Sequence, residues 1–151
     1  MSQEKYQKIS TYKDILAWQK SVELAVKIYR ATDQFPENEK FGLTNQIRRA
    51  VVSISSNIAE GFGRKSSIER IRFYEISRGS LNEVESQLII ACEIGYISTE
   101  TFQDIQELLS NTAGLLKGLI SKTSLMNKSL DSWLSTHDSS ERKIWQIRNT
   151  N

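Results

Sequence analysis

Cysteine, histidine and proline each occur only once in this chain, at Cys92, His137 and Pro36. A single proline and few clusters of turn residues argue against a β-sandwich or barrel, in which turn signals recur. One cysteine excludes an internal disulfide, and we interpret Cys92, on an apolar helical stripe, as a small core residue. The chain also lacks a membrane-spanning apolar run and, at residues 1–5, the apolar stretch of a signal peptide. We therefore expect a cytoplasmic protein with no membrane partner.

Catalytic and cofactor-binding patterns are equally scarce. One histidine and one cysteine cannot supply a zinc-ligand set or a Cys–His or Ser–His–Asp nucleophile. Gly61 and Gly63 flank Phe62, but the third glycine and the preceding strand of a nucleotide-binding loop are missing. The Glu-x-x-His motif of di-iron helix bundles is also missing. The sequence thus predicts no enzyme, no metal and no cofactor.

What the chain does contain is helical periodicity. Hydrophobic residues make up 38% and charged residues 25% of its 151 residues, which is typical of one globular domain. Four amphipathic segments with short breaks predict an all-α fold, an antiparallel up-down-up-down four-helix bundle. We place the bundle at residues 12–134, between a disordered N-terminal segment (1–11) and a polar, basic C-terminal tail (135–151).

The first two predicted helices flank Pro36. The first begins near Tyr12 and Asp14 and ends before Phe35, because a residue that precedes proline is disfavoured in the α region. Its apolar positions are Ile15, Trp18, Val22, Ala25, Ile28 and Tyr29. The second begins at 37–39 and stops at 61–63, where glycine is free to take a positive φ. Its stripe is Leu43, Ile47, Ala50, Val51, Ile54 and Ile58.

The last two predicted helices are each preceded by a serine. Ser66 or Ser67 is expected to cap the third helix, and Gly95 marks its end. Its apolar positions are Phe73, Ile76, Leu81, Val84, Leu88, Ala91 and Cys92. Ser98 or Thr99 caps the fourth, whose apolar positions are Phe102, Ile105, Leu108, Leu109, Ala113, Leu116, Leu119 and Ile120.

Positive charge is concentrated in the middle of the chain. Residues 40–78 carry eight basic and three acidic side chains, a net charge of +5, whereas the remainder carries −3. The candidate nucleic-acid-binding residues around the turn at 61–67 are Arg48, Arg49, Arg64, Lys65, Arg70, Arg72 and Arg78. Arginine matches phosphate oxygens with two parallel hydrogen bonds, although a solvated charged face explains the same residues. Tyr74 lies near Arg70 and Arg78 by helical spacing and could stack on a base.

A second group of polar residues recurs at helical spacing beside the apolar stripes. On the second helix these are Arg49, Ser53, Ser56, Asn57 and Glu60, and on the third they are Ser80, Glu83 and Gln87. They either form hydrogen bonds between helices that fix the helix register or, with the arginines, form a surface for a partner or a neighbouring subunit.

Several motifs resemble the bacterial four-helix-bundle family named for the 23S rRNA intervening sequence, also called the S23 family. The first motifs are Tyr12-Lys13-Asp14-Ile15-x-x-Trp18-Gln19, Phe35-Pro36-x-x-Glu39-x-Phe41-Gly42-Leu43-Thr44 and Gln46-Ile47-Arg48-Arg49-Ala50. The most specific is Ser53-Ile54-x-x-Asn57-Ile58-Ala59-Glu60-Gly61-x-Gly63-Arg64. Gly79-Ser80-Leu81-x-Glu83-x-x-x-Gln87-Leu88 and Gly95-Tyr96-Ile97 complete a pattern that spans residues 12–120.

The resemblance implies a fold, an assembly and a partner. Members of this family are four-helix bundles that assemble into homopentamers with a central funnel, and an RNA-binding role is proposed for them. A related branch, the accessory proteins of diversity-generating retroelements, binds a reverse transcriptase and its RNA. Trp18, Val52 and Phe62, at the stripe edges, are candidates for subunit contacts. The chain departs from the pattern after Leu125, with a tail that contains Trp133, Trp145 and a basic cluster.

Three hypotheses follow. The first is a non-catalytic, RNA-associated oligomer whose basic helix 2–3 hairpin contacts phosphates. The second is an adaptor for a protein partner such as a reverse transcriptase, with the tail from Ser135 as the docking element. The third is a self-assembling bundle that binds neither.

Overall fold

The computed structural model describes residues 9–137, 139 and 141–143, and these residues form helices and turns without a strand. The elements are η1 (Tyr12–Asp14), α1 (Leu16–Thr32), η2 (Glu37–Glu39), α2 (Leu43–Phe62), α3 (Ser67–Glu93) and α4 (Thr99–Thr136). Residues 139 and 141–143 are also helical. The predicted all-α class is confirmed.

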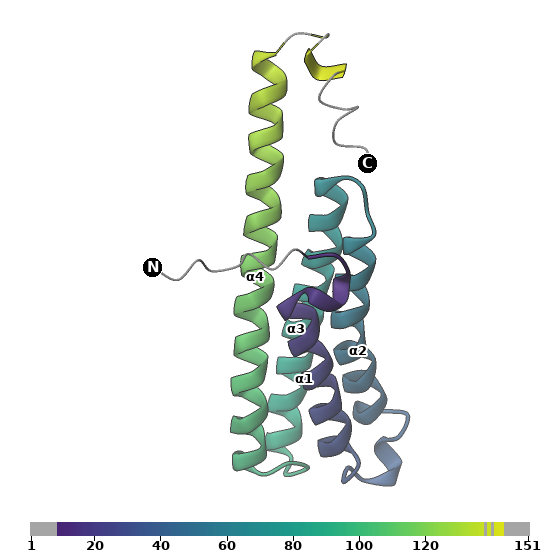
Figure 1. Ribbon diagram of the computed structural model, residues 1–151. Coiled ribbons are helices and arrows are strands. Elements are labelled where there is room, and N and C mark those ends of the chain that lie inside the picture. Colours follow the sequence, from purple (N-terminus) through teal and green to yellow (C-terminus); the bar gives the residue numbers. More distant parts are fainter. Residues whose placement is uncertain (1–8, 138, 140, 144–151) are drawn as a thin grey trace.

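The four α-helices lie side by side along most of their length (Figure 1). Contacts join α1 to α2, α2 to α3 and α3 to α4, and α4 also contacts α1. Each helix therefore has two neighbours, and its apolar stripe faces a shared interior.

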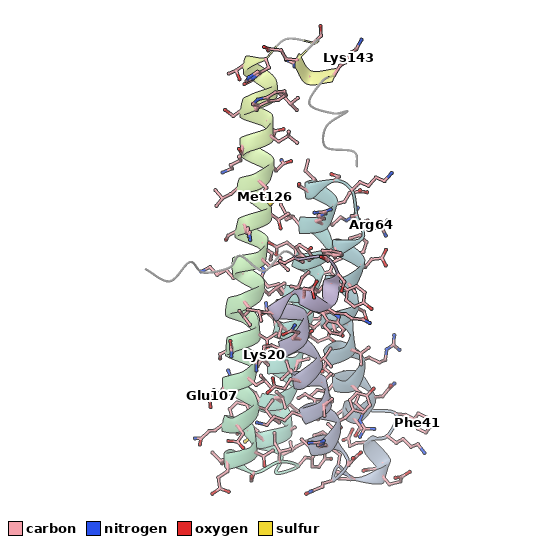
Figure 2. The ribbon with its side chains drawn as sticks, in the orientation of Figure 1. Lys20, Phe41, Arg64, Glu107, Met126 and Lys143 are labelled. Carbon is pink, nitrogen blue, oxygen red and sulfur yellow. The ribbon has the colours of Figure 1, made fainter. Side chains whose placement is uncertain are left out.

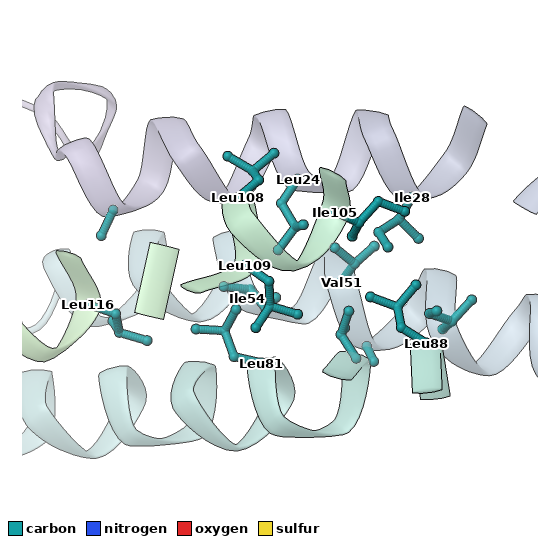
Figure 3. Packing of buried hydrophobic residues seen from close by; sticks show 14 of the residues in the cluster. Leu24, Ile28, Val51, Ile54, Leu81, Leu88, Ile105, Leu108, Leu109 and Leu116 are labelled. Atoms are coloured by element: carbon teal, nitrogen blue, oxygen red, sulfur yellow. The ribbon is translucent and has the colours of Figure 1, made fainter. Parts of the chain in front are cut away.

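The interior is filled by aliphatic side chains from all four helices (Figure 3). Those with no exposed surface include Leu24, Ile28, Ile47, Val51, Ile54, Ile58, Val84, Ile105 and Leu116. The predicted stripe of α1 is confirmed at Ile15 and Ile28, which are buried, and at Trp18 and Ala25, which pack against the core. Its centre is shifted, because Ala17, Ser21 and Leu24 are also buried, whereas Tyr29 is 42% exposed. Ile76 of α3 was also predicted to be buried and is 46% exposed.

The starts of the first two helices differ from the prediction. The segment at 12–14 is a separate 3-10 helix, capped by Thr11, and α1 begins only at Leu16. The segment at 37–39 is likewise a short 3-10 helix, because Gly42, at φ −101° and ψ −123°, interrupts the helical path before Leu43. The Glu39 carboxylate accepts a hydrogen bond from the Leu43 N–H, at 2.8 Å, and so caps α2.

The predicted stop of α2 at 61–63 is confirmed, since the helix ends at Phe62 with Gly63 as its C-cap, but neither glycine there takes a positive φ. Gly61 lies inside the helix and is buried, and Gly63 follows it with φ −71°. Among the described residues only Gly95 has a positive φ, of 81°. There the Tyr96 N–H donates to the Ala91 carbonyl and the Gly95 N–H to the Cys92 carbonyl, which is a Schellman ending for α3.

The last helix, α4, is much longer than its neighbours, at 38 residues. Ser98 caps its first turn by accepting a hydrogen bond from the Thr101 N–H. Thr123 is its last buried residue, and the helix continues to Thr136 beyond the ends of the other helices (Figure 1). None of the described helices is both long and apolar enough to cross a membrane.

Candidate nucleic-acid interface

The basic region is built on the connection between α2 and α3. Only residues 63–66 separate the two helices, and α3 runs back along α2. Ser53 and Ser80 share a hydrogen bond of 2.9 Å between their hydroxyl groups, which fixes the level of one helix against the other. The turn therefore lies at one end of the hairpin (Figure 2), close to Arg64.

Three of the predicted polar residues lie together in the seam between these helices. The Asn57 amide donates to the Ser53 carbonyl at 2.8 Å and to its hydroxyl at 3.0 Å. Ser80 also donates to the Ile76 carbonyl, at 3.1 Å. These groups satisfy one another inside the hairpin.

The remaining polar positions are separate from this cluster. Glu60 pairs with Arg64 one turn later on the chain. Gln87 donates to the Glu83 carboxylate at 3.2 Å, and Ser56 donates to the Val52 carbonyl of its own helix. The structure thus divides the predicted set into a seam cluster and local pairs.

Sequence reasoning missed Ser77, which is fully buried. Its hydroxyl donates to the Ile54 carbonyl at 2.9 Å and so joins α3 to α2 through the core. The sequence did contain a signal, because the helical spacing of Ser77 from Tyr74 and Leu81 places it on the buried side of α3. A hydroxyl group buried there needs a hydrogen-bond partner.

The side chain of Arg48 is hydrogen-bonded to the C-terminal end of α1. Its guanidinium donates to the Asp33 carboxylate at 2.7 Å, to the Thr32 hydroxyl at 2.8 Å and to the Tyr29 carbonyl at 3.2 Å. It also lies 4.7 Å from the centre of the Tyr29 ring. The guanidinium thus donates to a free carbonyl group and neutralises a carboxylate at the C-terminal end of α1, where the helix dipole also favours a positive charge. This arginine therefore has a structural role.

Two other arginines hold the turn itself. Arg70 donates to the Arg64 carbonyl at 2.6 Å, across the turn. The Arg64 guanidinium pairs with Glu60 and lies 4.7 Å from the centre of the Phe73 ring. Its side chain is still 40% exposed.

Three cations of the region are exposed and unpaired: Arg49, Lys65 and Arg72 form no ion pair or side-chain hydrogen bond with any described residue. The hydrogen bond between Ser53 and Ser80 marks one height along the hairpin. Arg49 lies four residues from Ser53 on one side of this height, and Arg72 lies eight residues from Ser80 on the other. At 1.5 Å per residue, the two arginines are therefore separated by roughly 18 Å along the helix axes. Arg78 pairs with Glu75 at 2.6 Å, but its side chain is 62% exposed. The region therefore offers three free cations and two exposed, exchangeable ones.

Tyr74 cannot serve as the predicted stacking platform, because it is 2% exposed and packs in the core. A Cβ atom on Gly61 would lie 2.7 Å from its ring, so the glycine makes room for the tyrosine. Burial raises the pKa of the Tyr74 hydroxyl, and the charge of Arg70 opposes the shift.

The other predicted contact residues vary in exposure. Trp18 and Phe62 pack against the core, and Trp18 lies edge-on to Tyr12 with ring centres 5.2 Å apart. Val52 is 42% exposed. In the predicted tail, the His137 ring stacks on Trp133 at 4.2 Å, whereas Trp145 and the basic residue Arg148 lie outside the described residues.

These observations define an all-helical protein with a cationic interhelical turn. The model of the family of 23S rRNA-intervening sequence proteins matches residues 13–118. The chain belongs to this family, and the suspected resemblance is confirmed.

A solved structure supports the same assignment. It is a protein of unknown function from the S23 ribosomal protein family of Bacteroides thetaiotaomicron, 29% identical, with a TM-score of 0.63. The similarity covers 70% of this chain and 98% of that one. A comparison with curated protein sequences gives no match.

Proposed function

We propose that this protein is a cytoplasmic, non-catalytic RNA-binding oligomer that contacts phosphates through the region around the α2–α3 turn. The observation that most directly supports this proposal is that one hairpin presents three exposed, unpaired cations, Arg49, Lys65 and Arg72. Unpaired cations bind phosphate without first losing an internal partner. The family name, which refers to 23S rRNA, supports RNA as the polyanion.

The seven basic residues have different parts in this proposal. Arg49, Lys65 and Arg72 contact phosphates directly, and Arg64 and Arg78 join them by exchanging exposed glutamate partners for phosphate. Arg48 and Arg70 support the scaffold, since their hydrogen bonds hold the end of α1 and the turn.

We also infer an antiparallel up-down-up-down four-helix bundle, supported by contacts between helices that follow one another in the chain. The resemblance stated above adds a homopentamer, in which several copies of the turn would present a larger cationic surface. Exposed Val52 is available for such subunit contacts.

The test is a titration of a fluorescent single-stranded RNA over a series of salt concentrations. Each phosphate contact contributes a slope of about −0.7 to the plot of log affinity against log salt. Replacing Arg49, Lys65 and Arg72 with glutamine should therefore make the slope shallower by about 2 and weaken binding at low salt.

The matched control replaces three exposed, unpaired cations elsewhere, Lys13, Arg30 and Lys117, with glutamine, so that net charge changes equally. This control should keep the wild-type slope. Equal loss in both triple variants would show non-specific attraction and contradict the proposed interface, as would wild-type RNA binding that does not respond to salt.

A second candidate, an adaptor for a protein such as a reverse transcriptase, is favoured by the far end of α4. A groove of about 440 Å³ lies there, lined by Ser67, Met126, Leu130 and Trp133. Met126 is 61% exposed. Deleting residues 127–151 should abolish capture of a co-expressed reverse transcriptase and leave RNA affinity unchanged. Loss of RNA affinity with unchanged capture would contradict the adaptor role.

A further inference from the structure

A polar groove lies between the last turns of α1 and the exposed part of α2. It has a volume of about 410 Å³, and both helices contribute to its lining. Tyr29 comes from α1, and Asn45, Arg49 and Ser56 come from α2. Val52 is the one aliphatic residue of the lining, so this groove differs in character from the apolar groove at the far end of α4.

The Tyr29 ring in this groove is held in place but is not covered. The Arg48 guanidinium lies over the ring, 4.7 Å from its centre. Arg48 is itself fixed by hydrogen bonds to Asp33, to Thr32 and to the Tyr29 carbonyl. Tyr29 nevertheless remains 42% exposed. An aromatic ring that is both fixed and exposed stacks on a nucleobase with little further loss of side-chain entropy.

The same groove holds a charge and polar groups that have no partner within the described part of the chain. Neither Arg49 nor the Asn45 amide forms an ion pair or a side-chain hydrogen bond there. The Ser56 hydroxyl donates to the Val52 carbonyl and keeps its capacity to accept. At spacings of four and seven residues, Asn45, Arg49 and Ser56 lie on one face of α2, in a row about 16 Å long.

We propose that this groove holds an unpaired base of a single-stranded RNA, which stacks on Tyr29 while Arg49 binds the adjacent phosphate and Asn45 bonds to the base edge. The inference rests on the proposed RNA binding and deepens it, because Arg49 belongs to both sites. The base must be unpaired, since bases within a duplex are already stacked and their edges are paired. The Asn45 amide both donates and accepts, as the edge of a base requires.

Tyr29 thereby gives the cationic region a contact that does not depend on charge. Lys65 and Arg72 attract any chain of phosphates, whether or not it carries bases. Stacking on an aromatic ring requires a base, and it tolerates every base because each has a flat face. Tyr29 takes the stacking role that is closed to Tyr74, which is buried.

The test is a titration of a fluorescent single-stranded RNA with Tyr29→Leu, Tyr29→Phe and the wild-type protein. Tyr29→Leu should weaken binding by about tenfold, because the stacked base loses its ring. The slope of log affinity against log salt should not change, since no phosphate contact is removed. Tyr29→Phe should bind like the wild type, because it keeps the ring and the Tyr29 hydroxyl has no hydrogen-bond partner among the described residues.

Two controls separate stacking from other effects. Inorganic polyphosphate, which carries no base, should bind equally well to all three proteins. Phe41→Leu removes a ring that does not line the groove: Phe41 is 88% exposed and projects from the end of the bundle (Figure 2). This variant should bind RNA like the wild type. Circular dichroism should show unchanged helicity in each variant, because both rings are exposed.

Three results would overturn the stacking proposal and leave the phosphate contacts in place. These are wild-type RNA affinity in Tyr29→Leu, an equal loss in Phe41→Leu, and weaker polyphosphate binding in Tyr29→Leu, which would show an effect on the scaffold. Failure of the proposed function has a different signature. Wild-type RNA binding would then respond neither to salt nor to the triple substitution of Arg49, Lys65 and Arg72, and the stacking proposal would fail with it.

Discussion

At the residue scale, the packing of Phe73 and Tyr74 of α3 against α2 depends on Gly61. This glycine is buried inside α2, and the Tyr74 ring and the Phe73 Cβ lie where a side chain would project. The tyrosine is itself buried, so neither ring nor backbone can move away freely.

Gly61→Ala is therefore expected to destabilise the protein by about 1–3 kcal/mol, the usual cost of adding a methyl group to a filled core. Gly79→Ala is the matched control, because Gly79 also lies inside a helix but nothing lies within 4 Å of an added Cβ. It should stabilise the protein by roughly 0.5–1 kcal/mol. Urea unfolding measures both, and two changes of the same sign would contradict the packing argument.

The arginines show what the sequence predicts at this scale and what it does not. The excess of positive charge in residues 40–78 is visible from the sequence alone. Which cations are free is not, because the partners of Arg48 come from the end of another helix and Arg70 bonds to a backbone carbonyl. Tyr74 was misjudged for a related reason: its burial follows from the glycine opposite it.

At the element scale, the 3-10 helix before α1 is held by a reciprocal cap. The Thr11 hydroxyl accepts from the Lys13 N–H, and the Asp14 carboxylate accepts from the N–H groups of Ser10 and Thr11, both at 2.9 Å. These backbone hydrogen bonds hold the pKa of Asp14 below its ordinary value of 3.8.

Because the folded pKa of Asp14 is lowered, its stabilising effect is complete above pH 3.8 and is lost as the pH falls through the folded value. We expect the Ser10 and Thr11 amide resonances to shift together in an acid titration followed by NMR, with a midpoint below 3.8. Asp14→Asn should abolish that transition. A midpoint at or above the ordinary value would contradict the cap.

The part of α4 beyond Thr123 is an element with little support from the rest of the fold. It covers residues 124–136, about 20 Å of helix, with Leu125 66% exposed and Met126 61% exposed. Few buried contacts hold it, so its contribution to the stability of the body should be small.

Deleting residues 127–151 is accordingly expected to change the free energy of unfolding by less than about 1 kcal/mol. Leu116→Ala on the same helix is the contrast, because Leu116 is fully buried and its truncation should cost about 2–5 kcal/mol. Thermal unfolding compares the two. A truncation as costly as Leu116→Ala would show that the end of α4 packs on the body.

Periodicity predicted the existence and approximate extent of all four α-helices, because each buries one stripe. It did not predict the late start of α2, which depends on the backbone angles of Gly42 and on the Glu39 cap. The shifted stripe of α1 has a similar cause: Ser21 is buried and its hydroxyl bonds to the Trp18 carbonyl, so hydropathy understates its burial.

At the scale of the whole molecule, the two candidate binding surfaces involve different elements. The free cations Arg49, Lys65 and Arg72 belong to the α2–α3 hairpin, whereas the groove with Met126, Leu130 and Trp133 lies at the far end of α4. Substitutions on the hairpin should therefore leave partner capture intact, and truncation of α4 should leave RNA binding intact, so the two functions can be measured independently.

The most direct measurement of the central claim is the position of RNA on the protein surface. Ultraviolet cross-linking of the full chain to a single-stranded RNA at low salt, followed by mass spectrometry, would identify the contacting peptides. The account predicts cross-linked nucleotides on peptides between residues 49 and 78, with the exposed residues of α4 from Glu100 to Lys122 unmodified. Cross-links concentrated on α4, or spread evenly over the four helices, would contradict it.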